Sequence, residues 1–121
     1  MSAKILVIDD DREIVALVRS RLTASGYSVI SAADGEEGWE ITRREYPDLI
    51  VADIMMPKVN GWQFGQLVKD TPKTRKIPII FLSAMVQAEG RSENDQPGDY
   101  LLAKPFDAEK LLSAIKTLLK S

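Results

Sequence analysis

The fold of this chain is decided by a short apolar run that ends in a carboxylate, Leu49-Ile50-Val51-Ala52-Asp53. An apolar, β-prone run of this length between turn-forming residues is typical of a strand that is buried on both faces. Pro57 follows soon afterwards and ends the extended segment. Open α/β sheets bind their ligands at the carboxyl ends of the strands, so Asp53 is predicted to be the working residue.

Four other short runs have the same strand-like character. They are residues 5–8, 27–32, 77–82 and 100–103. Between them, apolar residues at helical spacing predict helices over residues 11–26, 36–46 and 61–69, and Asp107 is expected to cap a last helix with an apolar stripe from Leu111 to Leu119. This alternation predicts one α/β domain over residues 1–121, a doubly wound five-stranded parallel sheet with helices on both faces.

Two helical segments carry details that the structure can test. In the first helix, Ile14, Leu17, Val18 and Leu22 fall at helical spacing, and Asp11 is expected to be its N-cap. Residues 87–98 contain two glycines, one proline and almost no apolar side chains, so a fourth helix in this place is expected to be weak or irregular.

Composition excludes several classes of site. The chain has 121 residues with neither Cys nor His, so thiolate metal sites, disulfides and a phosphohistidine of its own are ruled out. Sixteen basic and 18 acidic residues give a net charge of −2, which does not suggest direct binding to nucleic acid. No apolar run approaches the length of a membrane span, so a cytoplasmic protein without membrane insertion is expected.

In a parallel sheet the ends of the strands meet at one edge, and the polar residues there have complementary chemistry. They are Asp9, Asp10 and Asp11 after the first strand, Asp53 at the third, Ser83 after the fourth and Lys104 after the fifth. Two carboxylates about 4 Å apart repel by about 4 kcal/mol at an effective dielectric near 20, so a proton or a cation is needed among them. Mg²⁺, which binds through one or two carboxylates plus phosphate oxygens, fits best.

This set of groups favours phosphoryl transfer to Asp53, with an acyl phosphate as the product. The cation offsets repulsion between the attacking carboxylate and the phosphoryl group, and Ser83 and Lys104 hold the remaining phosphoryl oxygens. Taken singly, each residue has a simpler explanation, because acids and serines often cap helices and a lysine before proline is often a solvated charge. Four strand ends that carry matching groups outweigh those separate explanations. Trp39 and Trp62 are expected to lie on core or half-buried helix faces.

Four motifs together resemble the receiver domain of two-component response regulators. They are Leu6-Val7-Ile8-Asp9-Asp10, Asp53-Ile54-Met55-Met56-Pro57 with Gly61, Ser83-Ala84 and Lys104-Pro105-Phe106. The resemblance covers the whole chain. It implies a flavodoxin-like fold with strand order 2-1-3-4-5, and an aspartate that is phosphorylated by a sensor histidine kinase, a phosphotransfer protein or a small phosphodonor.

The resemblance also implies a role for each residue. Asp53 would accept the phosphoryl group, and Ser83 and Lys104 would contact it. Asp10, Asp53 and the main-chain carbonyl of Met55 would hold Mg²⁺, while Asp9 would reach the ion through a water molecule. Pro105 would follow a cis peptide bond.

The chain departs from the family pattern near its fifth strand. The family's switch aromatic usually lies three residues before the lysine, where this chain has Leu101. Tyr100 would reach the same pocket only if the strand register shifted. Ser83 and Lys104 are 21 positions apart (104 − 83), one fewer than expected. The phosphorylation chemistry is therefore expected to be intact, while the usual switch and output face are in question.

The predicted function is signalling rather than enzymatic turnover. Phosphorylation would shift a conformational population that is read by a downstream effector protein or a homodimer face. One alternative is a pseudo-receiver, which binds proteins without being phosphorylated. A second is a hydrolase of the haloacid dehalogenase type, which needs an acid two residues after the nucleophile, where this chain has Met55.

Overall fold

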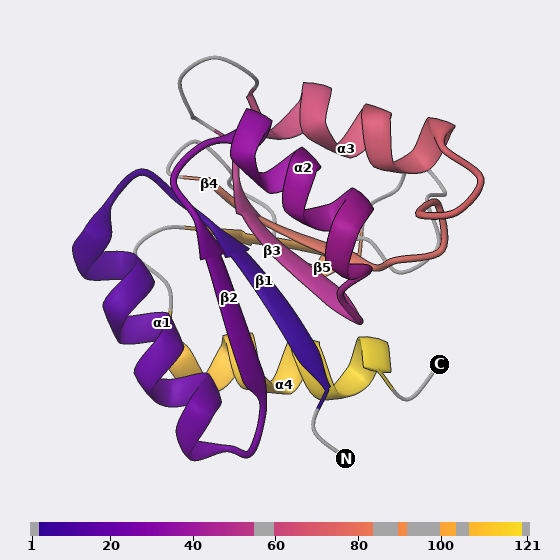
Figure 1. Cartoon of the computed structure of the whole chain (residues 1–121). Helices are drawn as coiled ribbons and strands as arrows, with labels where there is room; N and C mark the ends of the chain where they lie inside the picture. Colours follow the sequence, from indigo (N-terminus) through magenta and orange to yellow (C-terminus); the bar gives the residue numbers. More distant parts are fainter. Residues whose placement is uncertain (1–2, 55–59, 84–89, 92–99, 104–106, 120–121) are drawn as a thin grey trace.

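The computed structural model describes residues 3–54, 60–83, 90–91, 100–103 and 107–119. Its centre is a sheet in which five strands run parallel (Figure 1). These strands are β1 (Lys4–Ile8), β2 (Ser28–Ala32), β3 (Leu49–Asp53), β4 (Ile79–Ser83) and β6 (Tyr100–Ala103). They lie in the order β2-β1-β3-β4-β6, which is the order 2-1-3-4-5 of the five parallel strands. The predicted fold class and strand order are confirmed.

A sixth strand was not expected from the sequence. Residues Gly90–Arg91 form β5, which pairs antiparallel with β6 at the edge of the sheet. These two residues are the only described part of the segment 87–98, for which a weak or irregular helix was predicted, and they are extended. The rest of that segment lies outside the described residues.

Four helices connect or follow these strands in the described part of the chain. They are α1 (Arg12–Ala24), α2 (Gly35–Glu45), α3 (Gly61–Asp70) and α4 (Ala108–Leu119). Asp11 caps α1, as predicted, because its carboxylate accepts hydrogen bonds from the main-chain N–H groups of residues 13 and 14. Asp107 likewise accepts from the main-chain N–H of Glu109 at 2.8 Å. Asn60 and Gln63 form a reciprocal capping box at the start of α3.

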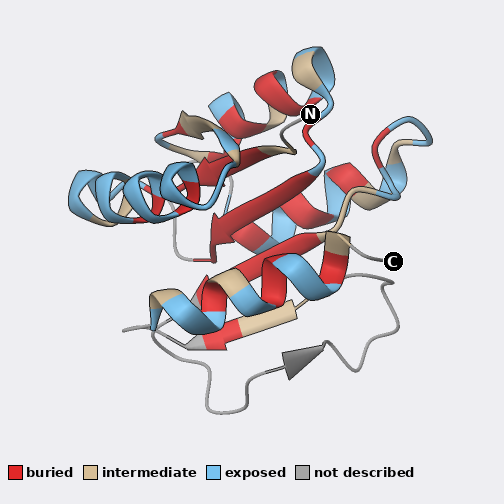
Figure 2. Cartoon of the chain, turned by 90° about the horizontal axis from the view of Figure 1, so that it is seen from below, coloured by how far each residue is buried: buried red, intermediate tan, exposed pale blue. Residues whose placement is uncertain are grey.

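The helices cover both faces of the sheet. Apolar residues of α1 and α4 pack with Val7, Val51 and Leu82 on one face, and those of α2 and α3 pack with Leu6, Ile50 and other strand residues on the opposite face. In Figure 2, the strands are coloured mostly as buried, and buried residues alternate with exposed ones along the helices. Every residue of β3 is buried, as expected for the central strand of a parallel sheet.

One apolar position of α1 lies outside the core. Leu17 is 51% exposed, although it falls at helical spacing with Val18 and Leu22, which are buried. Trp39 is half-buried against the α2–α3 side of the core, as expected, and the Arg43 guanidinium lies 5.4 Å from the centre of its ring. No helix in the described part of the chain combines the length and apolar composition that a membrane span requires.

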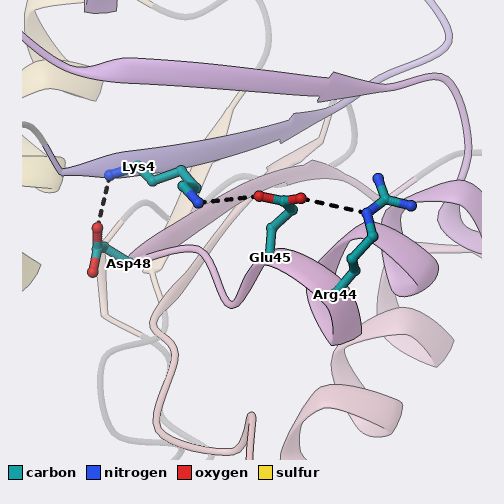
Figure 3. A network of polar contacts seen from close by, with 4 residues as sticks. All are labelled: Lys4, Arg44, Glu45 and Asp48. Atoms are coloured by element: carbon teal, nitrogen blue, oxygen red, sulfur yellow. Dashed lines mark hydrogen bonds and ion pairs between the residues drawn. The ribbon is translucent and has the colours of Figure 1, made fainter.

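A polar network fixes β1 against β3 at the end of the sheet where these strands begin (Figure 3). The main-chain N–H of Lys4 donates to Asp48 Oδ2 at 2.7 Å, and Lys4 Nζ lies 3.1 Å from Glu45 Oε1. Arg44 Nε lies 3.4 Å from the second Glu45 oxygen. Because β1 and β3 lead to Asp9 and Asp53 at their other ends, the network helps to fix the relative register of the two site strands.

Candidate functional site

The structure brings three of the predicted acids together at the carboxyl edge of the sheet, the end at which its parallel strands finish. Ile8, the last residue of β1, pairs in register with Ala52 of β3. Asp9 follows the first of these strands, and Asp53 ends the second. Carboxylate oxygens of Asp9, Asp10 and Asp53 all lie within 4.8 Å of one another. The parallel pairing of β1 with β3 is therefore what creates the acid cluster.

The three acids differ in their surroundings. Asp9 is 3% exposed and Asp53 is 5% exposed, whereas Asp10 is exposed. The main-chain N–H of Asp9 donates to the oxygen of Ala32 at 3.1 Å, and Asp9 Oδ1 accepts from the N–H of Asp11 at 2.9 Å. Asp11 does not join the cluster, because its carboxylate caps α1. The cluster thus offers a metal ion two buried carboxylates, Asp9 and Asp53, and one exposed carboxylate, Asp10.

This donor set suits a hard cation. Two negative charges 4.8 Å apart repel by about 3 kcal/mol at an effective dielectric near 20, so the folded chain gains if a cation lies among them. The donors are all carboxylate oxygens, without nitrogen or sulfur, and such sites favour Mg²⁺ or Ca²⁺ over zinc or copper. Three acids also leave coordination positions for water or a phosphate oxygen, which Mg²⁺ retains. The residues present therefore fit Mg²⁺.

Ser83 lies on the strand beside Asp53. Leu82 pairs in register with Asp53, and Ser83 is the next and last residue of β4. It pairs in turn with Ala103, the last residue of β6, which immediately precedes Lys104 in the chain. The main chain thus carries Ser83 to the same edge as the acids. Lys104, Pro105 and Met55, which the sequence also assigned to this site, lie outside the described residues.

The register of β6 decides between the two candidates for the switch position. Leu101 pairs with Phe81 and packs on the α2–α3 side of the core. Tyr100 pairs with Ile80 and packs on the opposite face, against the cluster formed with α1 and α4. The structure does not have the register shift that would bring Tyr100 to the face of Leu101, so that alternative is wrong. The position three residues before Lys104 therefore holds the aliphatic side chain of Leu101.

Sequence reasoning did not anticipate how closely Gly61 approaches the site. A Cβ atom on Gly61 would lie 2.6 Å from Ile54 Cα and 2.7 Å from the main-chain oxygen of Asp53. Its N–H donates to the oxygen of Ile54 at 2.9 Å. The motif drew attention to this glycine, but the need for it comes from the close contact of α3 with the end of β3.

A hollow beside Asp9 was also missed. It has a volume of about 410 Å³ and lies between the first two turns of α1 and the carboxyl end of β2. Arg12 and Arg19, two turns apart on α1, line it, and Arg19 Nη2 donates to Ser31 Oγ at 2.8 Å. The spacing of seven residues places both arginines on one helix face and could have indicated their proximity. They bring positive charge to an otherwise acidic edge.

Comparison with known proteins gives a consistent result. The family model described as "Response regulator receiver domain" matches residues 5–116. Among curated proteins, the chain is 42% identical over 118 residues to the probable transcriptional regulator ycf27 of Porphyridium aerugineum, covering 97% of this chain and 48% of that protein. It is 38% identical to the DNA-binding dual master transcriptional regulator RpaA of Synechocystis sp., covering 97% of this chain and 49% of the relative. The chain therefore spans about half the length of these relatives.

Solved structures show the same fold. A crystal structure described as a putative response regulator from Chloroflexus aurantiacus superposes with a TM-score of 0.87 at 26% identity, and the match covers 100% of both chains. A high-resolution structure of the chemotaxis response regulator CheY4 of Vibrio cholerae superposes with a TM-score of 0.84 at 30% identity, covering 98% of this chain and 99% of that one.

Proposed function

Because this chain belongs to the response regulator receiver family, we propose that it accepts a phosphoryl group on Asp53 in a Mg²⁺-dependent reaction. The proposal extends to the whole chain, residues 1–121, as one receiver domain. Phosphorylation then shifts a conformational population that a partner reads. A cytoplasmic location is part of the same prediction.

One observation carries this proposal. The carboxylates of Asp9, Asp10 and Asp53 converge within 4.8 Å at the carboxyl edge of a parallel sheet. A nucleophilic carboxylate needs access to a phosphorus atom and relief from repulsion by its oxygens. The cluster supports the second requirement, because it combines the Asp53 carboxylate with two further carboxylates that could hold a cation.

The reaction is an in-line displacement at phosphorus. An oxygen of the Asp53 carboxylate forms the new O–P bond while the bond from phosphorus to the donor nitrogen or oxygen breaks, and the bonding pair leaves with the donor. Asp9, Asp10, Asp53 and the Met55 carbonyl would hold Mg²⁺, which supplies positive charge that lowers repulsion between the two anions. Ser83 and Lys104 are proposed to bind the other phosphoryl oxygens.

The buried position of Asp53 supports a role as carrier rather than as a catalyst of rapid hydrolysis. The residue is 5% exposed at the end of a strand that is buried throughout, so water has little access to it from the described part of the chain. The aspartate is consumed in the transfer and must be dephosphorylated before it reacts again. The relatives reported above are named as regulators, which agrees with a signalling role.

The proposed phosphodonors are a sensor histidine kinase, a phosphotransfer protein or a small acyl phosphate. The proposed reader is a downstream effector or a second copy of the chain. The expectation of no contact with nucleic acid gains no support from the relatives, because one of them is named as a DNA-binding regulator. This chain corresponds to about half the length of that relative, so any link to DNA is a property to test.

The test is to treat the protein with Mg²⁺ and acetyl phosphate and to measure its intact mass. The parent should gain the mass of one phosphoryl group, and the gain should require Mg²⁺. Asp53→Asn should gain nothing, whereas Asp11→Asn should behave like the parent because Asn also caps α1 well.

Two results would contradict this proposal. A parent that neither gains mass nor binds beryllofluoride, a stable mimic of the acyl phosphate, would favour the pseudo-receiver alternative. An Asp53→Asn variant that still gains mass would place the acceptor at another residue.

A further inference from the structure

An aromatic pair joins α3 to the strand beside Asp53. The rings of Trp62 and Phe81 have centroids 4.8 Å apart and are tilted by 46°. Phe81 is 3% exposed, whereas Trp62 is 52% exposed. A Cβ atom on Gly65 would lie 2.8 Å from Phe81 Cζ, so the glycine leaves the space that the Phe81 ring fills. The first turns of α3 thus pack closely against the Phe81 ring.

The same two elements are joined a second time through the main chain. The N–H of Gly61 donates to the oxygen of Ile54 at 2.9 Å, and the N–H of Ile54 donates to the oxygen of Leu82 at 2.9 Å. Trp62 follows Gly61, and Phe81 precedes Leu82. The two main-chain hydrogen bonds and the ring contact therefore form a closed circuit of contacts between α3, Ile54 and β4. Asp53 is the residue before Ile54.

This circuit of contacts restricts movement of the main chain at the end of β3. Gly61 is in close contact with the main-chain oxygen of Asp53, so a shift of α3 changes the packing against the acceptor residue itself. Leu101 faces Phe81 from β6 in place of the family's aromatic residue. At this register position, Phe81 therefore has aliphatic neighbours on both adjacent strands, Ala52 of β3 and Leu101 of β6, and its aromatic contact is with Trp62 of α3.

We propose that the Trp62–Phe81 contact positions the Asp53 end of β3 and is coupled to occupation of Asp53 by a phosphoryl group. Trp62 and Phe81 are positioning residues, because they act through Gly61 and Ile54 rather than by touching the reacting atoms. The inference rests on the proposed phosphorylation of Asp53. Since coupling between two sites is reciprocal, loosening the ring contact must alter affinity at Asp53, and occupying Asp53 must alter the surroundings of Trp62.

The first experiment measures the effect of Asp53 on Trp62. The chain has two tryptophans, so the Trp39→Phe variant leaves Trp62 as the only indole. Adding beryllofluoride in the presence of Mg²⁺ should shift or quench the Trp62 emission. Asp53→Asn in the same background should remove this response. If beryllofluoride binds by calorimetry and the emission does not change, the inference is wrong and the proposed function stands.

The second experiment measures the reverse effect. Trp62→Ala should weaken beryllofluoride binding by about threefold or more, within the range by which connecting residues alter coupling, and Trp62→Phe should restore most of it. Leu67→Ala is the matched control, because it truncates another partly exposed apolar residue of α3, and it should leave the affinity unchanged. Thermal melting checks that each variant is folded.

A third variant perturbs Phe81, the partner of Trp62 in the ring contact. Gly65→Ala places a methyl group against the Phe81 ring and should weaken binding without altering Trp62 itself. Equal affinities of the parent, Trp62→Ala and Gly65→Ala would overturn the inference. A parent that does not bind beryllofluoride at all would reject the proposed function first, and the inference with it.

Discussion

A Cβ atom on Gly61 would lie 2.7 Å from the main-chain oxygen of Asp53. Real Cβ atoms do not approach another heavy atom so closely, and both nearest neighbours here, Asp53 O and Ile54 Cα, belong to the main chain. No side-chain rotation can therefore relieve the contact. The glycine is needed for close approach of the helix to the site strand rather than for an unusual backbone conformation.

Gly61→Ala is expected to displace the start of α3 from the end of β3. The overpacking should lower the free energy of unfolding by about 1–3 kcal/mol, and it should slow phosphorylation of Asp53 more than the lost stability explains. Denaturant unfolding and the rate of mass gain with acetyl phosphate measure the two effects. Val68→Ala is the control, since it truncates a buried side chain two turns further along α3 than Gly61 and should cost about 2 kcal/mol with little change in rate. Equal rates in the two variants would contradict the positional role of Gly61.

Tyr46 ends α2 in a left-handed conformation, with φ 46° and ψ 65°. This region is unfavourable for residues that have a Cβ, although Asn tolerates it better than most, and the Tyr46 side chain is 47% exposed. Tyr46→Asn should therefore raise the free energy of unfolding by about 0.5–1 kcal/mol. Tyr46→Ala also shortens the side chain but keeps a residue that disfavours this conformation, so it should give no such gain. Thermal or denaturant unfolding distinguishes the two outcomes.

Periodicity predicted the parallel sheet and the acid-bearing strand ends because the five parallel strands are short apolar runs separated by helical segments. Periodicity did not predict burial where the width of the buried helix face, rather than the spacing of its apolar residues, decides which side chains reach the sheet. Leu17 falls at helical spacing, yet Val18 and Leu22 already cover the sheet beneath α1, so Leu17 stays exposed. The two residues of β5 are too few to have a period.

The fine structure of the site was less accessible to sequence reasoning. Asp9 and Asp53 could be placed at one edge because neighbouring parallel strands end together. The contact of Gly61 with Asp53 depends on the distance between α3 and β3, which no sequence pattern encodes. The assignment of Leu101 and Tyr100 to opposite faces required the register of β6, since a shift of one residue would exchange them.

Glu45 gives stability a dependence on pH. The hydrogen bond from Lys4, followed by that from Arg44, holds the Glu45 pKa below its ordinary value of 4.5. A carboxyl group whose pKa is lower in the folded state contributes stability above its unfolded pKa, and this contribution disappears as the pH falls through the folded pKa. The parent should therefore be more stable than Glu45→Gln near neutral pH, and the difference should shrink as the pH falls below 4.5.

Lys4→Met supplies the control for that prediction, because Lys4 is the first cause of the lowered pKa of Glu45. In the Lys4→Met background, Glu45→Gln should have a smaller effect, and added salt should reduce the effect in the parent. Unfolding curves at several pH values measure these differences. A Glu45→Gln effect that is constant across pH would show that charge is not its cause.

Asp10 is expected to have opposite effects on stability with and without Mg²⁺. Without the ion, its carboxylate repels those of Asp9 and Asp53, so Asp10→Asn should raise the free energy of unfolding, by about 1 kcal/mol given the exposure of Asp10. With the ion, the parent should gain stability in proportion to the logarithm of the Mg²⁺ concentration above its dissociation constant, because only the folded chain brings the three acids together. The variant should gain less, so the two thermal melting curves should converge or cross as Mg²⁺ is added. Asp11→Asn removes a neighbouring charge that caps α1 and lies outside the cluster, and its response to Mg²⁺ should match that of the parent. If Asp10→Asn instead keeps the full Mg²⁺ response, Asp10 is not a ligand, and the cation is held by Asp9 and Asp53 without it.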